Sequence, residues 1–226
     1  MDEHTIFDWS RKARTGVPEV VFAEGKTVEQ IDDILMAHHE RSAPLLTTRL
    51  TPEQMAHLGA LTLPHLSLDP LARLASHRAP IPAADAPEVA VVCAGTSDLP
   101  VAREALLSAR FLGLRADLIC DVGVAGLWRL EQHLPTLTRH RVVIAVAGME
   151  GALFSVLGGL LPGAIIAVPT SVGYGVGAQG KAALSSALSS CAPGVLTVNI
   201  DNGFGAAAAA AKILRPPQIQ SDNPSG

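Results

Sequence analysis

The sequence predicts an α/β fold of three layers, in which helices cover both faces of a five-stranded, mainly parallel, Rossmann-like sheet. Between Arg141 and Gly205, short apolar runs alternate with Gly-rich turns and Ala-rich segments of helical length. Polar residues in this stretch gather at the ends of the apolar runs, and in open α/β sheets the carboxyl ends of the strands bind ligands. These residues are Glu150, Thr170, Ser171, Tyr174, Cys191, Asn199, Asp201 and Asn202.

A small α/β subdomain is predicted for residues 1–75, after a polar lead-in over 1–16. Residues 18–25 have the composition of a strand that ends in a glycine turn. Thr27 is placed to cap a helix that extends to about His39. A second strand is predicted over 45–48, and a short helix over 52–58 follows Thr51.

The larger domain is predicted for residues 88–215. A connector over 76–87 precedes it, because that segment contains three prolines and several alanines. Ser97 or Asp98 is expected to cap the helix that Pro100 opens. Strands are predicted over 88–93, 116–121, 142–145, 165–168 and 195–200, helices over 100–113, 126–134 and 206–211, and a disordered tail over 216–226.

Composition excludes several classes of protein. A net charge of −4 without a block of Lys or Arg gives no general attraction to nucleic acid or to anionic membranes. The N-terminus lacks the apolar core of a signal peptide, and Gly and Pro interrupt every apolar run before it reaches bilayer-spanning length. Three scattered cysteines fit a reducing compartment better than a disulfide framework. We therefore expect a cytoplasmic protein that binds a small molecule.

A GxGxxG pattern over 175–180 invites comparison with dinucleotide-binding turns, since Asp201 follows about 20 residues later. The dinucleotide turn should follow its strand almost directly, so that the helix N-terminus meets the pyrophosphate. Here residues 169–174 separate the strand from the first glycine. A Gly-rich loop that contacts a ligand is therefore the favoured interpretation, and a nicotinamide-type cofactor turn is the weaker one.

Metal-binding and nucleophilic patterns are sparse. All eight histidines lie at or before His140, and no CxxC or HExxH motif occurs, which argues against a structural zinc site. Cys191 lies in a turn that enters a strand, between Ser190 and a Pro-Gly pair. On its own, such a cysteine is more often a small buried apolar residue than a nucleophile.

Six motifs follow one another along the chain: GTSDLPV (95–101), DVGVAG (121–126), AGMEGA (147–152), VPTSVGYG (168–175), SC (190–191) and VNIDNGFG (198–205). In this order they resemble the LarB family, the pyridinium-3,5-biscarboxylic acid mononucleotide synthases of nickel-pincer cofactor biosynthesis. Residues 14–26 also resemble this family. The segment 88–215 is similar to the related aminoimidazole ribonucleotide carboxylase/mutase class as well. One departure is Trp128, which stands where the family's AGxHR-like run has histidine.

The resemblance implies an enzyme that carboxylates pyridinium C5 of nicotinic acid adenine dinucleotide with CO2 and hydrolyses its phosphoanhydride, giving the biscarboxylate mononucleotide and AMP. Cys191 would be the ring nucleophile, since a thiolate adduct turns C5 into a nucleophilic carbon. Glu150 is a candidate base, with capping of the next helix as its alternative role, and Asp98 a further catalytic candidate. Candidate substrate-binding residues are Lys26, Gly95, Thr96, Ser97, Thr170, Ser171, Tyr174, Asp201 and Asn202, with Arg49 as a further source of positive charge.

No bound organic cofactor is expected, while Mg²⁺ at the diphosphate, near Asp201, is an option. Two other functions stay open: a purine-type ribonucleotide carboxylase, and a dinucleotide-binding module without catalysis. The Ala- and Gly-rich segments 151–160 and 204–214 carry few charges, which favours a homo-oligomer. The related purine carboxylases are octameric, so the resemblance suggests a dimer or an octamer.

Overall fold

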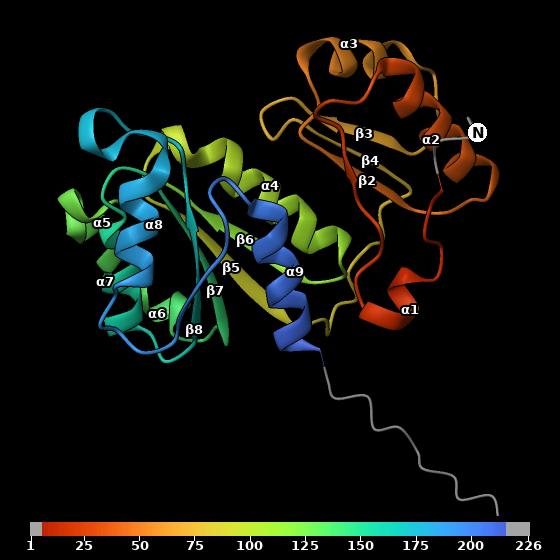
Figure 1. Cartoon of the computed structure of the whole chain (residues 1–226). Helices are drawn as coiled ribbons and strands as arrows, with labels where there is room; N and C mark the ends of the chain where they lie inside the picture. Colours follow the sequence, from red (N-terminus) through yellow and green to blue (C-terminus); the bar gives the residue numbers. More distant parts are fainter. Residues whose placement is uncertain (1–5, 216–226) are drawn as a thin grey trace, which may run out of the picture.

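The larger domain is built on a five-stranded sheet in which all strands run parallel, in the order β6-β5-β7-β8-β9 (Figure 1). The computed structural model describes residues 6–215. The chain adds β6 on one side of β5 and then crosses to add β7 on the other, so the strand order reverses between β5 and β7. The strands are β5 (Glu88–Cys93), β6 (Arg115–Ile119), β7 (Val142–Ala147), β8 (Ala164–Pro169) and β9 (Val195–Thr197).

These strands confirm the predicted sheet. Every residue of β7 is buried, because helices cover both of its faces, and this is why its sequence is a continuous apolar run. The last strand is shorter than predicted, since β9 ends at Thr197 rather than at Ile200. Residues 198–201 still hydrogen-bond to β8, through Val198 to Ala167 and Asp201 to Pro169, but they already turn toward the next helix.

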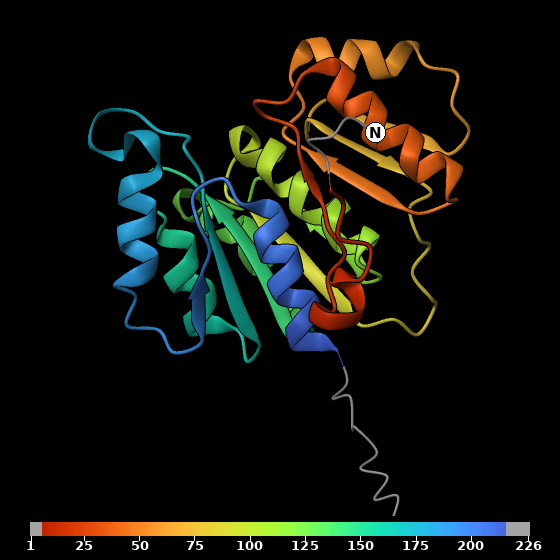
Figure 2. The same ribbon diagram turned by 45° about the vertical axis from the view of Figure 1, so that its right-hand side comes forward.

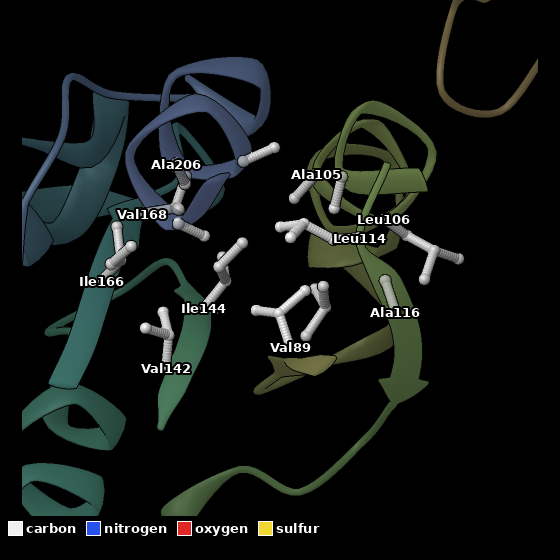
Figure 3. Packing of buried hydrophobic residues seen from close by; sticks show 14 of the residues in the cluster. Val89, Ala105, Leu106, Leu114, Ala116, Val142, Ile144, Ile166, Val168 and Ala206 are labelled. Carbon is white, nitrogen blue, oxygen red and sulfur yellow. The ribbon is translucent and has the colours of Figure 1, made fainter. Parts of the chain in front are cut away.

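Helices cover the two faces of the sheet and complete the predicted three layers. On one face, Ala105 of α4 and Ala206 of α9 pack against Val89, Ile144 and Val168 (Figure 3). Their small side chains allow the two helices to approach each other and the sheet closely. The helices on this face are α4 (Leu99–Phe111) and α9 (Gly203–Leu214), and those on the other are α5 (Leu127–Glu131), α6 (Leu134–Leu137), α7 (Ala152–Leu160) and α8 (Lys181–Leu188).

The N-terminal domain contains a four-stranded mixed sheet in the order β1-β2-β4-β3. Only β1 and β2 are parallel. Thr27 and Thr51 cap α2 and α3 as predicted, and in each case a glutamine three residues later bonds back to the threonine N–H. The elements are α1 (Arg11–Thr15), β1 (Val21–Phe22), α2 (Val28–Glu40), β2 (Leu45–Thr48), α3 (Pro52–Ala60), β3 (Leu66–Asp69) and β4 (Leu74–His77).

Two strands, β3 and β4, are absent from the sequence-based prediction. Both are only four residues long, and β4 reads Leu-Ala-Ser-His, which has weak intrinsic preference for a strand. Their pairing with each other and with β2 provides the stabilisation that local sequence lacks. Because β4 continues to His77, the irregular connection to β5 covers residues 78–87 and begins two residues later than predicted. The predicted disordered tail, 216–226, lies outside the described residues.

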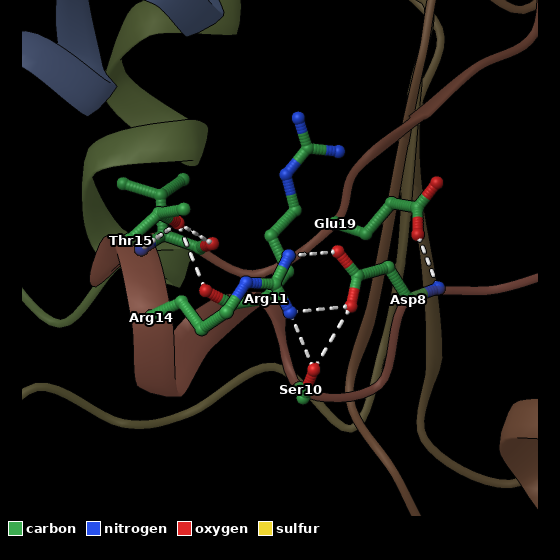
Figure 4. A network of polar contacts seen from close by, with 7 residues as sticks. Asp8, Ser10, Arg11, Arg14, Thr15 and Glu19 are labelled. Carbon is green, nitrogen blue, oxygen red and sulfur yellow. Dashed lines mark hydrogen bonds and ion pairs between the residues drawn. The ribbon is translucent and has the colours of Figure 1, made fainter.

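The lead-in to the N-terminal domain is held by a small polar network (Figure 4). Arg14 donates to both carboxylate oxygens of Asp8, at 3.0 and 2.6 Å, and these bonds lower the pKa of Asp8 to about 2. The backbone N–H of Asp8 donates to Glu19 at 2.6 Å. The residues before β1 therefore fold back on one another through polar contacts, although α1 itself buries no residue.

The two domains pack against each other through α4, which lies between their sheets (Figure 2). Phe111 of α4 packs with Leu46 and Leu74 of the small sheet. Two ion pairs join the domains near these contacts: Arg103 of α4 with Asp69, and Arg49 with Glu104 of α4. The N-terminal domain is thus fixed beside the carboxyl ends of the larger sheet. Across residues 6–215, every helix is too short or too polar to cross a bilayer.

Candidate functional site

A cavity of about 590 Å³ lies at the carboxyl ends of β5 and β7, where the strand order reverses. This is the position at which open α/β sheets bind ligands. Ala94 and Ala147 lie at its base, and the loops after β5, β6, β7 and β8 surround it. Of the predicted residues, Gly95, Ser97, Asp98, Glu150 and Tyr174 line this main cavity.

The loop after β5 brings a buried carboxyl group into the main cavity. Residues 96–98 form a 3₁₀ turn before α4, and Asp98 is only 4% exposed. One carboxylate oxygen accepts a hydrogen bond from the Gly95 N–H at 2.9 Å, and the other accepts from the Thr170 hydroxyl at 2.6 Å. Burial raises the pKa of Asp98, although these two bonds act in the opposite direction. Asp98 occupies the N-cap position of α4 as expected, but its side chain makes no capping bond to that helix and bonds Gly95 and Thr170 instead.

The loop after β7 contacts the loop after β8, and Gly148 makes the contact possible. A Cβ atom at Gly148 would lie 2.2 Å from the Val172 carbonyl oxygen and 2.6 Å from the Thr170 hydroxyl oxygen. The next residue, Met149, has φ of 52° and donates its N–H to the same Val172 carbonyl at 2.9 Å. Glu150 follows, exposed at the cavity edge, and does not cap α7, because Gly151 occupies the N-cap position.

Asp121 and Arg129 are site residues that sequence reasoning missed. Both line the main cavity, and the Arg129 Nη1 lies 2.6 Å from a carboxylate oxygen of Asp121. Asp121 follows β6 with φ of 58°. Four of the connections after strands of the larger sheet contain a non-glycine residue with positive φ: Asp121, Met149, Gln179 and Asp201. Such strained residues concentrate at functional sites. The motif DVGVAG and the Arg of the AGxHR-like run were signals for this pair.

Trp128, at the position where the family motif carries histidine, contributes no side chain to the lining of the main cavity. Its side chain is 62% exposed, whereas the adjacent Arg129 lines the main cavity. The GxGxxG segment forms the irregular 3₁₀ element η3 (Gly175–Gly180), which begins only after residues 170–174. As expected, it does not make a dinucleotide-binding turn directly after its strand.

The remaining polar candidates lie beside the main cavity rather than in it. Thr170 is buried and donates its hydroxyl to Asp98, while Thr96 is exposed on the 3₁₀ turn. Asp201 accepts the Ser171 N–H at 2.8 Å, and both residues line a second cavity next to the N-terminal domain. Asn202 caps α9 by accepting the Gly205 N–H at 2.8 Å, a structural role that the prediction missed. Across residues 6–215, no three His, Cys, Asp or Glu side chains converge on a possible metal position, so Mg²⁺ near Asp201 stays a prediction.

Two predicted site residues lie elsewhere in the chain. Lys26 is exposed on the N-terminal domain and lines a different hollow with Glu19 and Phe22. Cys191 is exposed in the connection from α8 to β9, at the amino end of the sheet (the lower end in Figure 1).

The hydrogen-bond register places the end of this connection beside the start of β8. The Gly194 carbonyl accepts from Ile165 at the start of β8, and Thr170 follows five residues later. That separation is about 16 Å at 3.3 Å per residue.

Comparisons with known proteins agree with this two-domain organisation. Residues 2–79 match the family model of the LarB/PurE-like N-terminal domain, and residues 88–221 match the model of AIR carboxylase. "Uncharacterized protein MJ0165" of Methanocaldococcus jannaschii is 35% identical over 224 residues, which cover 95% of this chain and 86% of that protein. Crystal structures of PurE and of a PurE2 variant from Treponema denticola each align at 23% identity with a TM-score of 0.47, over 56% and 57% of this chain and 79% of theirs.

Proposed function

The chain belongs to the AIR carboxylase family and carries a LarB/PurE-like N-terminal domain, and we propose that it carboxylates and hydrolyses nicotinic acid adenine dinucleotide. One observation supports this above the others. Four motifs that are far apart in the sequence, over 95–101, 121–126, 147–152 and 168–175, all contribute residues to the main cavity. These are motifs that gave the resemblance to the LarB family, so the resemblance is concentrated where a ligand would bind.

The proposed carboxylation begins with addition of a thiolate to pyridinium C4, which forms a C–S bond and leaves a neutral dihydropyridine. C5 is then nucleophilic and forms a C–C bond with CO2. A base removes the C5 proton, the C–S bond breaks, and the expelled thiolate restores the aromatic cation. Water cleaves the phosphoanhydride to release AMP. The cycle needs no oxidant, because the thiolate is recovered.

The two carboxyl groups of the main cavity suit different parts of this chemistry. Glu150 is exposed at the cavity edge and is the proposed acceptor of the C5 proton. Asp98 is buried, and its raised pKa keeps the neutral form, which can donate a proton, available to higher pH. We propose that Asp98 donates a hydrogen bond to the developing carboxylate or a proton to the leaving phosphate oxygen, while Thr170 and Gly95 hold it in place.

Cys191 does not line the main cavity of its own chain, and we propose that a second copy of the chain supplies this nucleophile. Cys93, near the main cavity, is a poor substitute, because burial raises the pKa of its thiol to about 12. Exposed apolar side chains occur at both places that such an assembly would join: Trp128, Tyr174 and Val176 at the cavity end of the sheet, and Leu160, Leu188 and Leu196 on the elements next to the Cys191 turn. We propose a homo-oligomer in which the Cys191 turn of one copy meets the main cavity of the next.

A purine-type ribonucleotide carboxylase is the second candidate. The observation that favours it is the absence of an exposed thiol from the residues that line the main cavity within one described chain. A carboxylase that needs no covalent adduct could act in this cavity without assembly. A binding module without catalysis is the third possibility.

One experiment separates the three. The protein is incubated with nicotinic acid adenine dinucleotide and ¹³C-bicarbonate, and in parallel with aminoimidazole ribonucleotide, and the products are identified by mass spectrometry. We expect a labelled carboxylated mononucleotide and AMP from the dinucleotide. Labelled product from the ribonucleotide alone would replace the proposal with the second function. If both substrates bind measurably but stay intact, the result would support a binding module without catalysis.

A further inference from the structure

The structure contains a second cavity, of about 220 Å³, between the N-terminal domain and the carboxyl end of the larger sheet. Arg49 and Arg73 line it from the N-terminal domain, and Ser97, Ser171 and Asp201 line it from the larger domain. We propose that this interdomain cavity binds a ribose phosphate group, and that in the proposed reaction it holds the adenylate half of the dinucleotide. The assignment of that half rests on the function proposed above.

Position is the first argument. Ser97 and Val172 line both the main cavity and the interdomain cavity, so the two share a border. A molecule that fills the main cavity and extends past these two residues therefore enters the interdomain cavity. A dinucleotide has this two-part shape, with its diphosphate between the two nucleosides. The shared border is thus the expected position of the diphosphate.

Charge is the second argument. The main cavity is lined by the carboxyl groups of Asp98, Asp121 and Glu150, and within the described chain its single basic residue is Arg129, which already pairs with Asp121. A dinucleotide brings at least two phosphate charges. The additional guanidinium groups next to this cavity are those of Arg49 and Arg73, and both come from the N-terminal domain.

The two arginines are held in place by the protein itself. Arg73 donates from Nε to the Leu50 carbonyl at 2.7 Å and from Nη2 to the Arg49 carbonyl at 3.3 Å. These bonds use two of its five N–H groups, so further donors remain for a phosphate. Arg49 lies 3.3 Å from the buried carboxylate of Glu104 through Nε and also bonds the Asp201 carbonyl.

The carboxylates of the interdomain cavity are consistent with a sugar. Glu104 is 4% exposed, pairs with Arg49 and accepts the Phe204 N–H at 2.8 Å, so the protein already satisfies it. Asp201 uses one carboxylate oxygen for the Ser171 N–H. Its other oxygen can accept from ribose hydroxyls, as acidic residues do in nucleotide sites. Guanidinium groups that bind phosphate and an Asp201 carboxylate that accepts from the ribose hydroxyls together fit a ribose phosphate group.

Calorimetric titration of the full chain tests the interdomain cavity without relying on turnover. AMP, nicotinic acid mononucleotide and the dinucleotide are titrated into the wild type, Arg73→Ala, Arg73→Lys and Arg11→Ala. Arg11 is an exposed arginine on α1 and serves as the matched control. For Arg73→Ala we expect the Kd of AMP and of the dinucleotide to rise at least about tenfold, because charge-assisted hydrogen bonds to phosphate are lost. The mononucleotide should change less than twofold, Arg73→Lys should be intermediate, and Arg11→Ala should match the wild type.

The results for the interdomain cavity and for the proposed reaction can be told apart. Equal AMP and dinucleotide affinity in the wild type and Arg73→Ala, or no AMP binding to the wild type at millimolar concentration, would overturn the ribose phosphate assignment even if carboxylation occurs. Selective loss of AMP binding in Arg73→Ala would support the interdomain cavity even if no carboxylated product forms. Circular dichroism melting of each variant excludes unfolding as the cause, and Arg73→Lys preserves the test if Arg73→Ala does not fold.

Discussion

The two ends of the parallel sheet differ in almost every property that matters for chemistry. At the carboxyl end, four loops surround the main cavity, four non-glycine residues have positive φ, and Asp98 is buried with a raised pKa. At the amino end, the α8–β9 connection exposes Cys191, and the neighbouring elements expose Leu160, Leu188 and Leu196. The covalent reaction proposed here needs a carboxyl group from one end and a thiol from the other. The comparison teaches that the described chain does not place Cys191 among the residues that line its main cavity, so the proposed reaction relies on assembly to bring the two together.

The largest expected effect is at the amino end. Cys191→Ser should fold normally, because the side chain is exposed, yet lose carboxylation to below detection, since an alcohol stays protonated and does not add to the pyridinium. Labelled product formation and a thermal melt measure the two properties. Cys120→Ser, which changes another exposed cysteine, is the matched control and should retain activity. A Cys191→Ser protein that keeps most of its rate would end the covalent mechanism.

A mixed oligomer tests whether the two ends meet between copies. Cys191→Ser and Asp98→Asn chains are each inactive in this scheme, but co-expression should restore about a quarter of the wild-type rate, because random neighbours combine one intact cavity with one intact thiol. Light scattering should show an assembly larger than the monomer. If both variants assemble together and activity stays absent, the thiol and the cavity of one catalytic site belong to the same chain.

Asp98→Asn should have a large effect of a different kind at the carboxyl end. The change keeps the shape of the side chain but removes its proton chemistry, and we expect kcat to fall by roughly 10² to 10⁴-fold. Steady-state rates with labelled bicarbonate give the value. Asp85→Asn, at an exposed position of the connector, is the control and should match the wild type. A fall of less than about threefold in Asp98→Asn would assign Asp98 to structure rather than to catalysis.

Gly148→Ala should have an intermediate effect, on stability. The added Cβ would collide with the Val172 carbonyl and the Thr170 hydroxyl, so the loops after β7 and β8 must separate. We expect a loss of about 1–3 kcal/mol in the free energy of unfolding, as for other overpacked positions. Gly159→Ala is the control, because a Cβ there meets no atom within 4 Å and alanine is a better helix former. Equal stability of Gly148→Ala and the wild type would show that the two loops are not packed as described.

The smallest expected effect is on the pH dependence of stability. Burial raises the pKa of Asp98 and of Glu104, so the folded protein binds more protons than the unfolded chain between about pH 4 and their folded pKa values. Each group therefore contributes stability that is complete below pH 4 and is lost as pH rises through its folded pKa. Chemical denaturation from pH 4 to 8 should show a smaller loss with rising pH in Glu104→Gln than in the wild type. Parallel curves for the two proteins would contradict a raised pKa at Glu104.

The sequence by itself determined the three-layer fold, the strands of the larger sheet and the capped helices α2 and α3. These features depend on local patterns: apolar runs such as 142–147, and threonines followed three residues later by glutamine. The pattern of polar residues after parallel strands also predicted that Glu150 and Tyr174 lie at one end of the sheet, and the family resemblance added Gly95, Ser97 and Asp98; all five line the main cavity.

Tertiary structure decided what each of those residues contacts. Thr170 donates to Asp98 across 72 residues of the chain, whereas Asn202 caps α9 through Gly205 and Asp121 pairs with Arg129 within one stretch of the chain. It also placed Cys191 at the opposite end of the sheet from Asp98 and brought Arg49 and Arg73 of the N-terminal domain beside the main cavity. A sequence pattern fixes the periodicity and ends of an element, whereas the distance between two elements depends on packing across the whole chain.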